Sequence, residues 1–216
     1  FGDVRGWVTG GFHRPASGML ISLAGQSEEG WRQNADYLLG NGVLRGWRSV
    51  GAGRLEGGLY LYGSDWNSPG FVSVDRYNQG DLEAATDTTD GGDGQRYIGT
   101  LRYGLPLGPK TTLDAQLWGQ LAQSTVFLTL PEDDVLRQTA ERDDREALGF
   151  QALLNRATDD GEFSLGASGR ADWTSYTLDE TVQRESVSAV QADEGRYQAI
   201  GLFARWRGML GTRFLY

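Results

Sequence analysis

The sequence lacks cysteine and has a single histidine, and these absences remove several classes of chemistry. With no cysteine among 216 residues, disulfides and thiolate metal sites are excluded. His13 is the one histidine, which argues against most zinc sites and most histidine-based catalysis. We expect His13 to be a hydrogen-bonded residue beside a short turn, and we expect the protein not to be an enzyme.

Positive charge and long apolar runs are also scarce. The formal net charge is −9, so nucleic acid, which requires a basic surface, is not an expected partner. No apolar run approaches the roughly 18 residues of a membrane helix. Strands of a membrane barrel need only about 9–11 residues of alternating polarity, so the composition remains compatible with such a barrel.

What the sequence has in abundance is alternation and glycine. The 32 glycines are about twice the average usage. In "GEFSLGASGRADW" (161–173), one alternate series is apolar from Phe163 to Trp173, whereas the other is polar or small. This period of two predicts strands with one lipid-facing and one lumen-facing side. We expect small lumen residues such as Gly166 and Ser168 to leave room for an object inside.

Short turns and long connections alternate along the chain. The short turns fall at 13–17, 49–53, 106–110, 157–161 and 207–211, and the long connections at about 26–36, 65–94, 122–144 and 174–194. Between them we predict about ten strands: 4–13, 18–26, 40–49, 54–64, 95–104, 110–121, 145–156, 161–173, 195–206 and the start of one near 212. Acidic residues gather in the predicted long loops, which is typical of the extracellular loops of an outer-membrane barrel.

This pattern predicts an all-β, antiparallel, up-and-down transmembrane β-barrel. Trp173 is expected at the upper rim of the lipid face, with Tyr103, Phe163 and Trp206 at the lower rim. Because "TRFLY" (212–216) is about half a spanning strand, residues 1–216 are expected to be one segment of a larger barrel. A soluble antiparallel β-domain with one wet face is the alternative.

Three stretches resemble the barrel of TonB-dependent outer-membrane receptors. These are "SEEGWRQNADY" (27–37), "LYLYGSDWNSPGFVSVDRYNQGD" (59–81) and "DTTDGGDGQRYIGTLRYG" (87–104), the last two with W-x-x-P-G and G-G-D-x-x-R motifs. The resemblance implies a bacterial outer-membrane location, 22 strands, a plug domain inside the barrel, and import of a scarce ligand such as a ferric siderophore, driven by the TonB complex. Neither a plug domain nor a TonB-contacting box is expected within these 216 residues.

Candidate binding residues follow from the expected position of each side chain. Lumen-facing Arg96, Arg102, Arg170 and Trp118 would form a hydrogen-bonding wall that holds a plug or contacts a ligand. Aromatic and Arg side chains in the loops suit an anionic ligand such as a ferric siderophore. The loop candidates are Trp66, Arg76, Tyr77 and Tyr176. Acidic loops would equally be explained by lipopolysaccharide bound through divalent cations.

The acidic stretch "DTTDGGDG" (87–94) raises the possibility of a calcium site. The EF-hand pattern fails, because positions 87, 89 and 91 are Asp, Thr and Gly. We expect a turn-forming loop there, although Asp87, Asp90 and Asp93 could ligate a cation in an irregular geometry. No metal or cofactor is expected. The alternative to an energised transporter is a passive porin, or a structural barrel that anchors a surface assembly.

Overall fold

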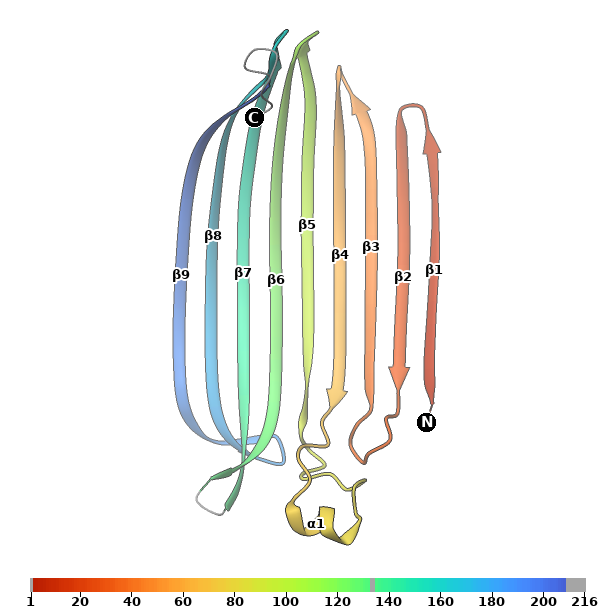
Figure 1. Cartoon of the computed structure of the whole chain (residues 1–216), viewed down its shortest axis with the longest axis vertical. Coiled ribbons are helices and arrows are strands. Elements are labelled where there is room, and N and C mark those ends of the chain that lie inside the picture. Colours follow the sequence, from red (N-terminus) through yellow and green to blue (C-terminus); the bar gives the residue numbers. More distant parts are fainter. Residues whose placement is uncertain (1, 133–134, 209–216) are drawn as a thin grey trace.

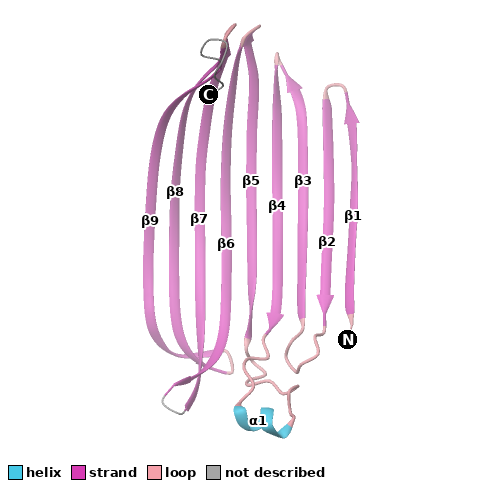
Figure 2. Cartoon of the chain, viewed as in Figure 1, coloured by secondary structure: helices cyan, strands magenta, loops and turns pink. Residues whose placement is uncertain are grey.

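The computed structural model describes residues 2–132 and 135–208, which form one antiparallel sheet with the strands in chain order (Figures 1 and 2). The strands are β1 (Asp3–Arg14), β2 (Ser17–Glu28), β3 (Tyr37–Val50), β4 (Gly53–Asn67), β5 (Gly91–Gly108), β6 (Thr111–Glu132), β7 (Val135–Ala157), β8 (Gly161–Val182) and β9 (Glu185–Gly208). The predicted all-β antiparallel class is confirmed. Within the described residues no ladder joins β1 to β9, so the sheet is open.

Short turns connect the strands at one end of the sheet, which we term the inner end. They occupy residues 15–16, 51–52, 109–110 and 158–160, and they confirm four of the predicted short turns. At the 51–52 turn, Gly51 has a φ of 59°, a conformation that favours glycine. The predicted strand near 212 and most of the predicted turn at 207–211 lie outside the described residues.

Two long connections lie at the opposite, outer end, and both were predicted. Residues 29–36 join β2 to β3, and residues 68–90, here called the cap loop, join β4 to β5. The cap loop contains the short helix α1 (Val74–Gln79), which lies beyond the strand ends in Figure 1. The Ser73 side chain caps its N-terminus by accepting a hydrogen bond from Arg76 N, and Gly80 ends it in the left-handed conformation. No helix in the described part of the chain is both long and apolar enough to cross a membrane.

The other two predicted long loops, 122–144 and 174–194, are wrong. Both segments continue the strands as antiparallel hairpins, with unbroken pairing from Gln123↔Asp144 to Glu132↔Val135 on β6 and β7. On β8 and β9 the pairing reaches Val182↔Glu185 with two register shifts. The apolar alternation stops in these segments, but the strands continue, because backbone pairing does not require an apolar face. The run "STVFLTL" (124–130) carried the missed signal, since β-branched and aromatic residues favour strands.

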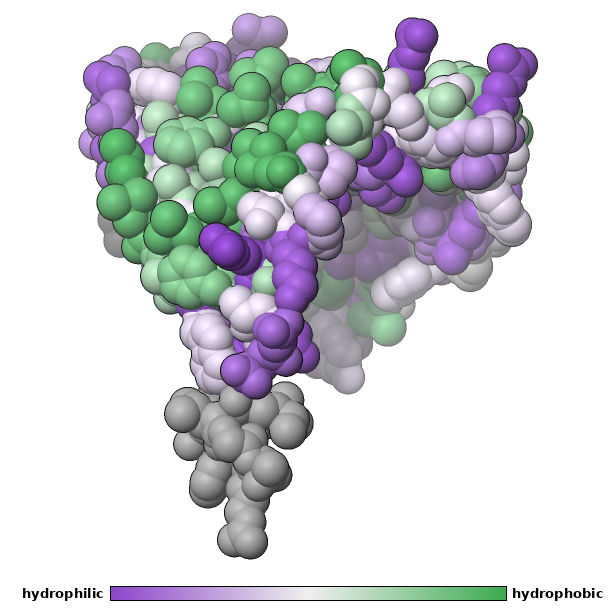
Figure 3. Space-filling view, turned by 90° about the horizontal axis from the view of Figure 1, so that it is seen from above, coloured by the Kyte–Doolittle hydropathy of each residue, from purple (hydrophilic) through white to green (hydrophobic). Residues whose placement is uncertain are grey.

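The nine strands together present one apolar face and one polar face. On the apolar face, large side chains are exposed in every described strand: Val8, Leu23, Leu44, Leu59, Leu101, Leu117, Leu148, Leu165 and Leu202. On β8, Leu165 is 50 % exposed, whereas the polar-face residues Ser164 and Asp172 are 1 % and 4 % exposed. The polar face is therefore the crowded, concave side. Seen from above in Figure 3, the sheet curves around a hollow, with hydrophobic residues gathered on part of its outside.

Some of the glycines are covered by aromatic rings on neighbouring strands. In five cross-strand pairs of the described residues, the aromatic ring would lie within 3 Å of a Cβ added to the glycine: Gly18↔Trp47, Trp66↔Gly92, Trp118↔Gly149, Phe150↔Gly169 and Gly166↔Phe203. At Gly166 an added Cβ would lie 2.1 Å from the Phe203 ring. The expectation that Gly166 leaves lumen space is wrong, because Phe203 fills that space. Such pairs let a ring lie flat on a sheet.

Candidate functional site on the polar face

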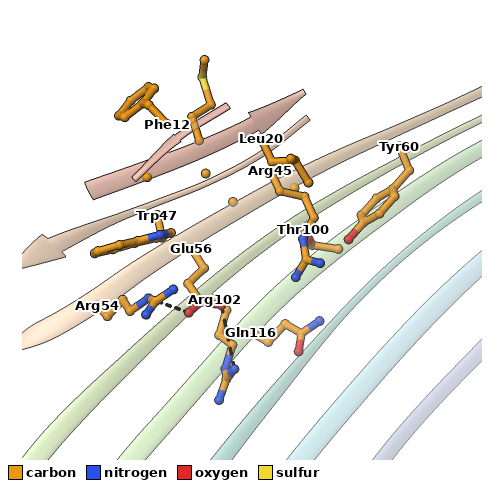
Figure 4. A pocket seen from close by; sticks show the side chains of 15 residues that line it. Phe12, Leu20, Arg45, Trp47, Arg54, Glu56, Tyr60, Thr100, Arg102 and Gln116 are labelled. Atoms are coloured by element: carbon orange, nitrogen blue, oxygen red, sulfur yellow. Dashed lines mark ion pairs between the residues drawn. The ribbon is translucent and has the colours of Figure 1, made fainter. Parts of the chain in front are cut away.

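A hollow of about 490 Å³ lies on the polar face near the inner end of β2–β6 (Figure 4). Trp47 of β3 lies at one side, and the Arg54 guanidinium of β4 stacks on it, 4.1 Å from the ring centroid. Arg54 Nε also lies 2.8 Å from Glu56 Oε1. The indole additionally contacts His13, with ring centroids 5.4 Å apart, so the single histidine packs against an aromatic wall.

Arg102 extends this network across β5 to β6. Its guanidinium donates to Asp114 Oδ1 at 2.6 and 3.0 Å and lies 3.9 Å from Glu56 Oε2. Arg45 and Gln116 also line the hollow. The result is a wall of alternating cationic and anionic groups along the hollow. Such a wall suits a polar macromolecular surface or a hydrophilic ligand.

Trp118 and Arg170, both predicted binding residues, form a second cluster farther along the polar face. The Arg170 guanidinium lies 5.6 Å from the Trp118 ring centroid. Gly149 lies between them on β7, and an added Cβ there would lie 2.6 Å from the indole, so the ring crosses the bare backbone to reach Arg170. Asp172 accepts from Arg170 Nη2 at 2.8 Å and from Arg145 Nη2 at 2.9 Å, which fixes both guanidinium groups.

The other predicted residues do not join this cluster. Trp66 lies at the outer end of β4 against Gly92 and Gly94, whereas Arg96 lies on β5 opposite Ala122. Arg76 and Tyr77 lie on α1; Arg76 Nη1 donates to Ala85 O at 3.0 Å, and Tyr77 is 66 % exposed.

Tyr176 lies on the outer extension of β8, opposite Asp143. Burial, and then the nearby Glu141, raises its pKa. The predicted set is therefore spread over two levels: a wall along the strands and a separate group at the outer end.

Sequence reasoning missed a buried polar cluster that fastens the cap loop to the sheet. Asp90, which has no exposed surface, accepts from Thr129 N at 3.0 Å, Thr129 Oγ1 at 2.7 Å and Gln138 Nε2 at 3.0 Å. Gln138 in turn accepts from Thr181 Oγ1 at 3.1 Å. The pairing of β6 with β5 stops at Gly91↔Phe127, and Asp90 accepts from the backbone N–H of Thr129 just beyond it. Asp90 thus protects an otherwise free strand edge.

The calcium reading of Asp87, Asp90 and Asp93 gains no support from this arrangement. Asp87 accepts from the backbone and hydroxyl of Thr89, and Asp90 from β6 and β7. Asp93 lies on β5, paired with Asp65 and Thr125. Among the described residues, no group of three His, Cys, Asp or Glu side chains is placed to hold a metal ion.

Arg184, at the turn between β8 and β9, holds the cap loop from a second side. Its Nε donates to Thr89 O at 2.7 Å and its Nη2 to Asn67 Oδ1 at 3.0 Å, while the guanidinium lies 5.1 Å from the Phe127 ring centroid. Gln183 and Arg184 both have positive φ, at 53° and 70°, as the tightest hairpin turns require. Local backbone strain is thus retained where a side chain anchors the loop.

Comparison with known proteins supports the fold. No protein-family model matches the sequence, and no curated relative matches it. The structure is similar to the crystal structure of the ferric citrate transporter FecA in its unliganded form, with a TM-score of 0.71 and 14 % sequence identity. The match covers 93 % of this chain and 35 % of that one, so the chain spans about a third of the length of that transporter. At this identity the likeness establishes a shared barrel-type sheet.

Proposed function

We propose that the chain forms part of the β-barrel of a TonB-dependent outer-membrane transporter that imports a scarce ligand, for which a ferric siderophore is our candidate. The observation that carries the proposal is an apolar face running through all the described strands opposite a charged, concave face. The fold likeness to a ferric citrate transporter and the receptor-like motifs support the choice among barrels.

The apolar face has the height that a bilayer demands. On β8 it runs from Phe163 to Trp173, ten steps of about 3.3 Å, or about 33 Å along the strand. At a strand tilt of ~40° this corresponds to about 25 Å, the height of the apolar band of membrane barrels. Phe163 pairs with Trp206 near the inner end, and the Trp173 ring, ten residues farther toward the outer end, lies 5.6 Å from the Arg196 guanidinium. These side chains would form the two interfacial girdles.

The polar face would line the lumen of the complete barrel. Its arginine–carboxylate wall, Arg54–Glu56–Arg102–Asp114, supports contact with a hydrophilic plug domain. At the outer end, exposed Tyr77 and the half-buried ring of Trp66 lie where an entering ligand would first be met. Lipopolysaccharide is an expected neighbour of the acidic outer extension.

Two experiments test this proposal. The full-length protein should partition into detergent extracts of outer membranes and migrate differently on gels before and after boiling. A water-soluble protein without heat-dependent mobility would contradict it. Ligand uptake should then stop when the inner-membrane TonB complex is deleted. Uptake that continues without the complex would identify a passive porin instead.

A further inference from the structure

The apolar face carries a second hollow, of about 580 Å³, near the inner end of β1–β4. It lies across the sheet from the polar hollow. Figure 4 shows Phe12 on one side of the strands, with Trp47, Glu56 and Arg102 on the other. Its walls are apolar side chains that are about half exposed: Phe12, Met19, Leu44, Leu59 and Leu101.

Two glycines facing each other form the floor of this hollow. Gly46 of β3 pairs with Gly57 of β4, in the row that also holds Met19 and Leu101. No ring covers them, unlike the five glycines in aromatic pairs: the nearest atom to an added Cβ would be Gly18 O at 3.5 Å for Gly46 and Thr100 O at 3.9 Å for Gly57. The floor is bare backbone with space above it, which is the shape of a groove for an alkyl chain.

Two arginines stand immediately below the groove, toward the inner end. Arg14, Ser17 and Arg48 form one cross-strand row on the apolar face, one step below Phe12 and Met19. The Arg14 guanidinium lies over the Phe12 ring at 5.6 Å, and Arg48 lines the hollow. In the described part of the chain, neither guanidinium has a carboxylate within ion-pair distance, and no acidic side chain lines the hollow. Their Cα atoms are separated by two strand spacings, about 10 Å.

We propose that this groove is a binding site for a glycerophospholipid, with an acyl chain over Gly46 and Gly57 and the phosphate between Arg14 and Arg48. The proposal rests on the proposed function, since the site requires the apolar face to meet a bilayer. Arginine guanidinium groups bind phosphate bidentately. The site has an apolar groove followed, toward the membrane boundary, by two arginines without a carboxylate partner. A phospholipid has matching parts in the same order, an acyl chain followed by a phosphate.

The arginine arm of the test removes the phosphate contacts. The protein purified in detergent is stripped of lipid and titrated with palmitoyl-oleoyl phosphatidylglycerol, and bound lipid is counted by native mass spectrometry. The double variant Arg14→Gln/Arg48→Gln should bind at least about tenfold more weakly. Arg156→Gln is the matched control, because Arg156 also lies at the inner end of the apolar face, on β7, away from the groove.

The glycine arm fills the groove without touching charge. Gly46→Leu places an alkyl group where the acyl chain would lie, and the available space allows it to fold. We expect loss of most retained lipid. Gly119→Leu is the control, since Gly119 lies on the apolar face of β6 with its nearest neighbour, Ala147 O, at 3.8 Å from an added Cβ.

The outcomes separate this inference from the proposed function. Lipid binding that is unchanged in the variants, or reduced equally in the controls, would overturn the site and leave the barrel standing, provided the protein retains heat-dependent mobility. Loss of that mobility in the unmodified protein would overturn both. A change from dimer to monomer in the Gly46→Leu variant, without loss of lipid, would assign the groove to a second copy of the chain and would also overturn the proposal.

Discussion

The long strands β6–β8 have two parts: one next to the short turns of the inner end, here called the lower part, and one next to the cap loop, here called the outer part. Their side chains follow different patterns, although the backbone pairing is continuous. In the lower part, the face that holds Leu148 and Phe150 is exposed and apolar. In the outer part, the same face of β7 holds Gln138 and Ala140, which are buried beneath the cap loop. Under the proposed function, the bilayer would supply the contacts that the lower face lacks within the chain. The outer face is covered by the chain itself.

Under the proposed function, this difference reflects what lipid and water each require of a strand. In the lower part, most side chains alternate in polarity, and ion pairs such as Arg102–Asp114 lie on the polar face. In the outer part, alternation fails and side chains bond across the cap loop, as in Thr129–Asp90. Four predictions test this contrast, from the largest expected effect to the smallest.

A charge placed on the lower apolar face should be the most damaging change. Leu117→Arg puts a guanidinium on the apolar face of β6, where Leu117 is 57 % exposed. We expect a loss of about 2–4 kcal/mol in the free energy of unfolding from lipid vesicles. Gln151→Arg, on the polar face of β7, is the control and should cost far less. Equal losses would show that both faces meet the same solvent.

Removing the carboxylate of Asp90 should open the cap loop and leave the lower sheet intact. Asp90→Ala leaves the N–H of Thr129 and the amide of Gln138 without an acceptor, a cost of about 1–3 kcal/mol. Hydrogen exchange should accelerate in residues 68–90 and in the outer extension of β6. Asp81→Ala, an exposed position in the same loop, is the control. Unchanged exchange in the Asp90 variant would show that the cluster does not hold the loop.

Crowding a covered glycine should cost about 1–3 kcal/mol. Gly149→Ala forces the Trp118 ring away, because the new Cβ would lie 2.6 Å from the indole. The contact between the Trp118 ring and Arg170 should be lost, and tryptophan fluorescence should change. For comparison, Gly119→Ala places its Cβ 3.8 Å from Ala147 O, an ordinary contact, and should leave stability within about 0.5 kcal/mol. Equal effects of the two variants would contradict the idea that rings cover particular glycines.

Breaking the polar wall should have the smallest effect. Arg102→Gln removes the contacts with Asp114 and Glu56, but the Arg102 side chain is 51 % exposed and its pairs are screened by water. We expect a change in unfolding free energy below about 1 kcal/mol. Chemical denaturation in low and high salt measures it. A loss of several kcal/mol would place this network among the main stabilising contacts.

The lower sheet could be predicted from the sequence because its side chains alternate in polarity with a period of two. The spacing of Phe163, Leu165 and Trp173 assigns them to one face of the strand before any neighbouring strand is known. The short turns are marked by proline and glycine. The all-β antiparallel class and four short turns followed from this. The number of strands in a complete barrel, the plug domain and the energy coupling remain predictions.

The outer part could not be predicted in the same way, because its order depends on pairs that are distant in sequence. Asp90 looks like a solvated loop acid until Gln138, 48 residues away, is placed beside it. Arg184 lies 95 residues from Thr89, the residue whose carbonyl it binds. Among the candidate site residues, the structure brings only Trp118 and Arg170 into contact. This contact could not be predicted, because it depends on the strand register across Gly149.

The central claim is that the two faces of β8 meet different solvents. Because residues 1–216 contain no cysteine, single cysteines at positions from 163 to 173 would carry a spin label without background from this segment. In the full-length protein in lipid vesicles, odd-numbered positions should be accessible to oxygen dissolved in the bilayer. Positions 168 and 170, the even-numbered ones that are not buried, should be accessible to a water-soluble nickel reagent. A period of two with opposite phase for the two reagents supports the account. Equal access of the nickel reagent to both faces would contradict it.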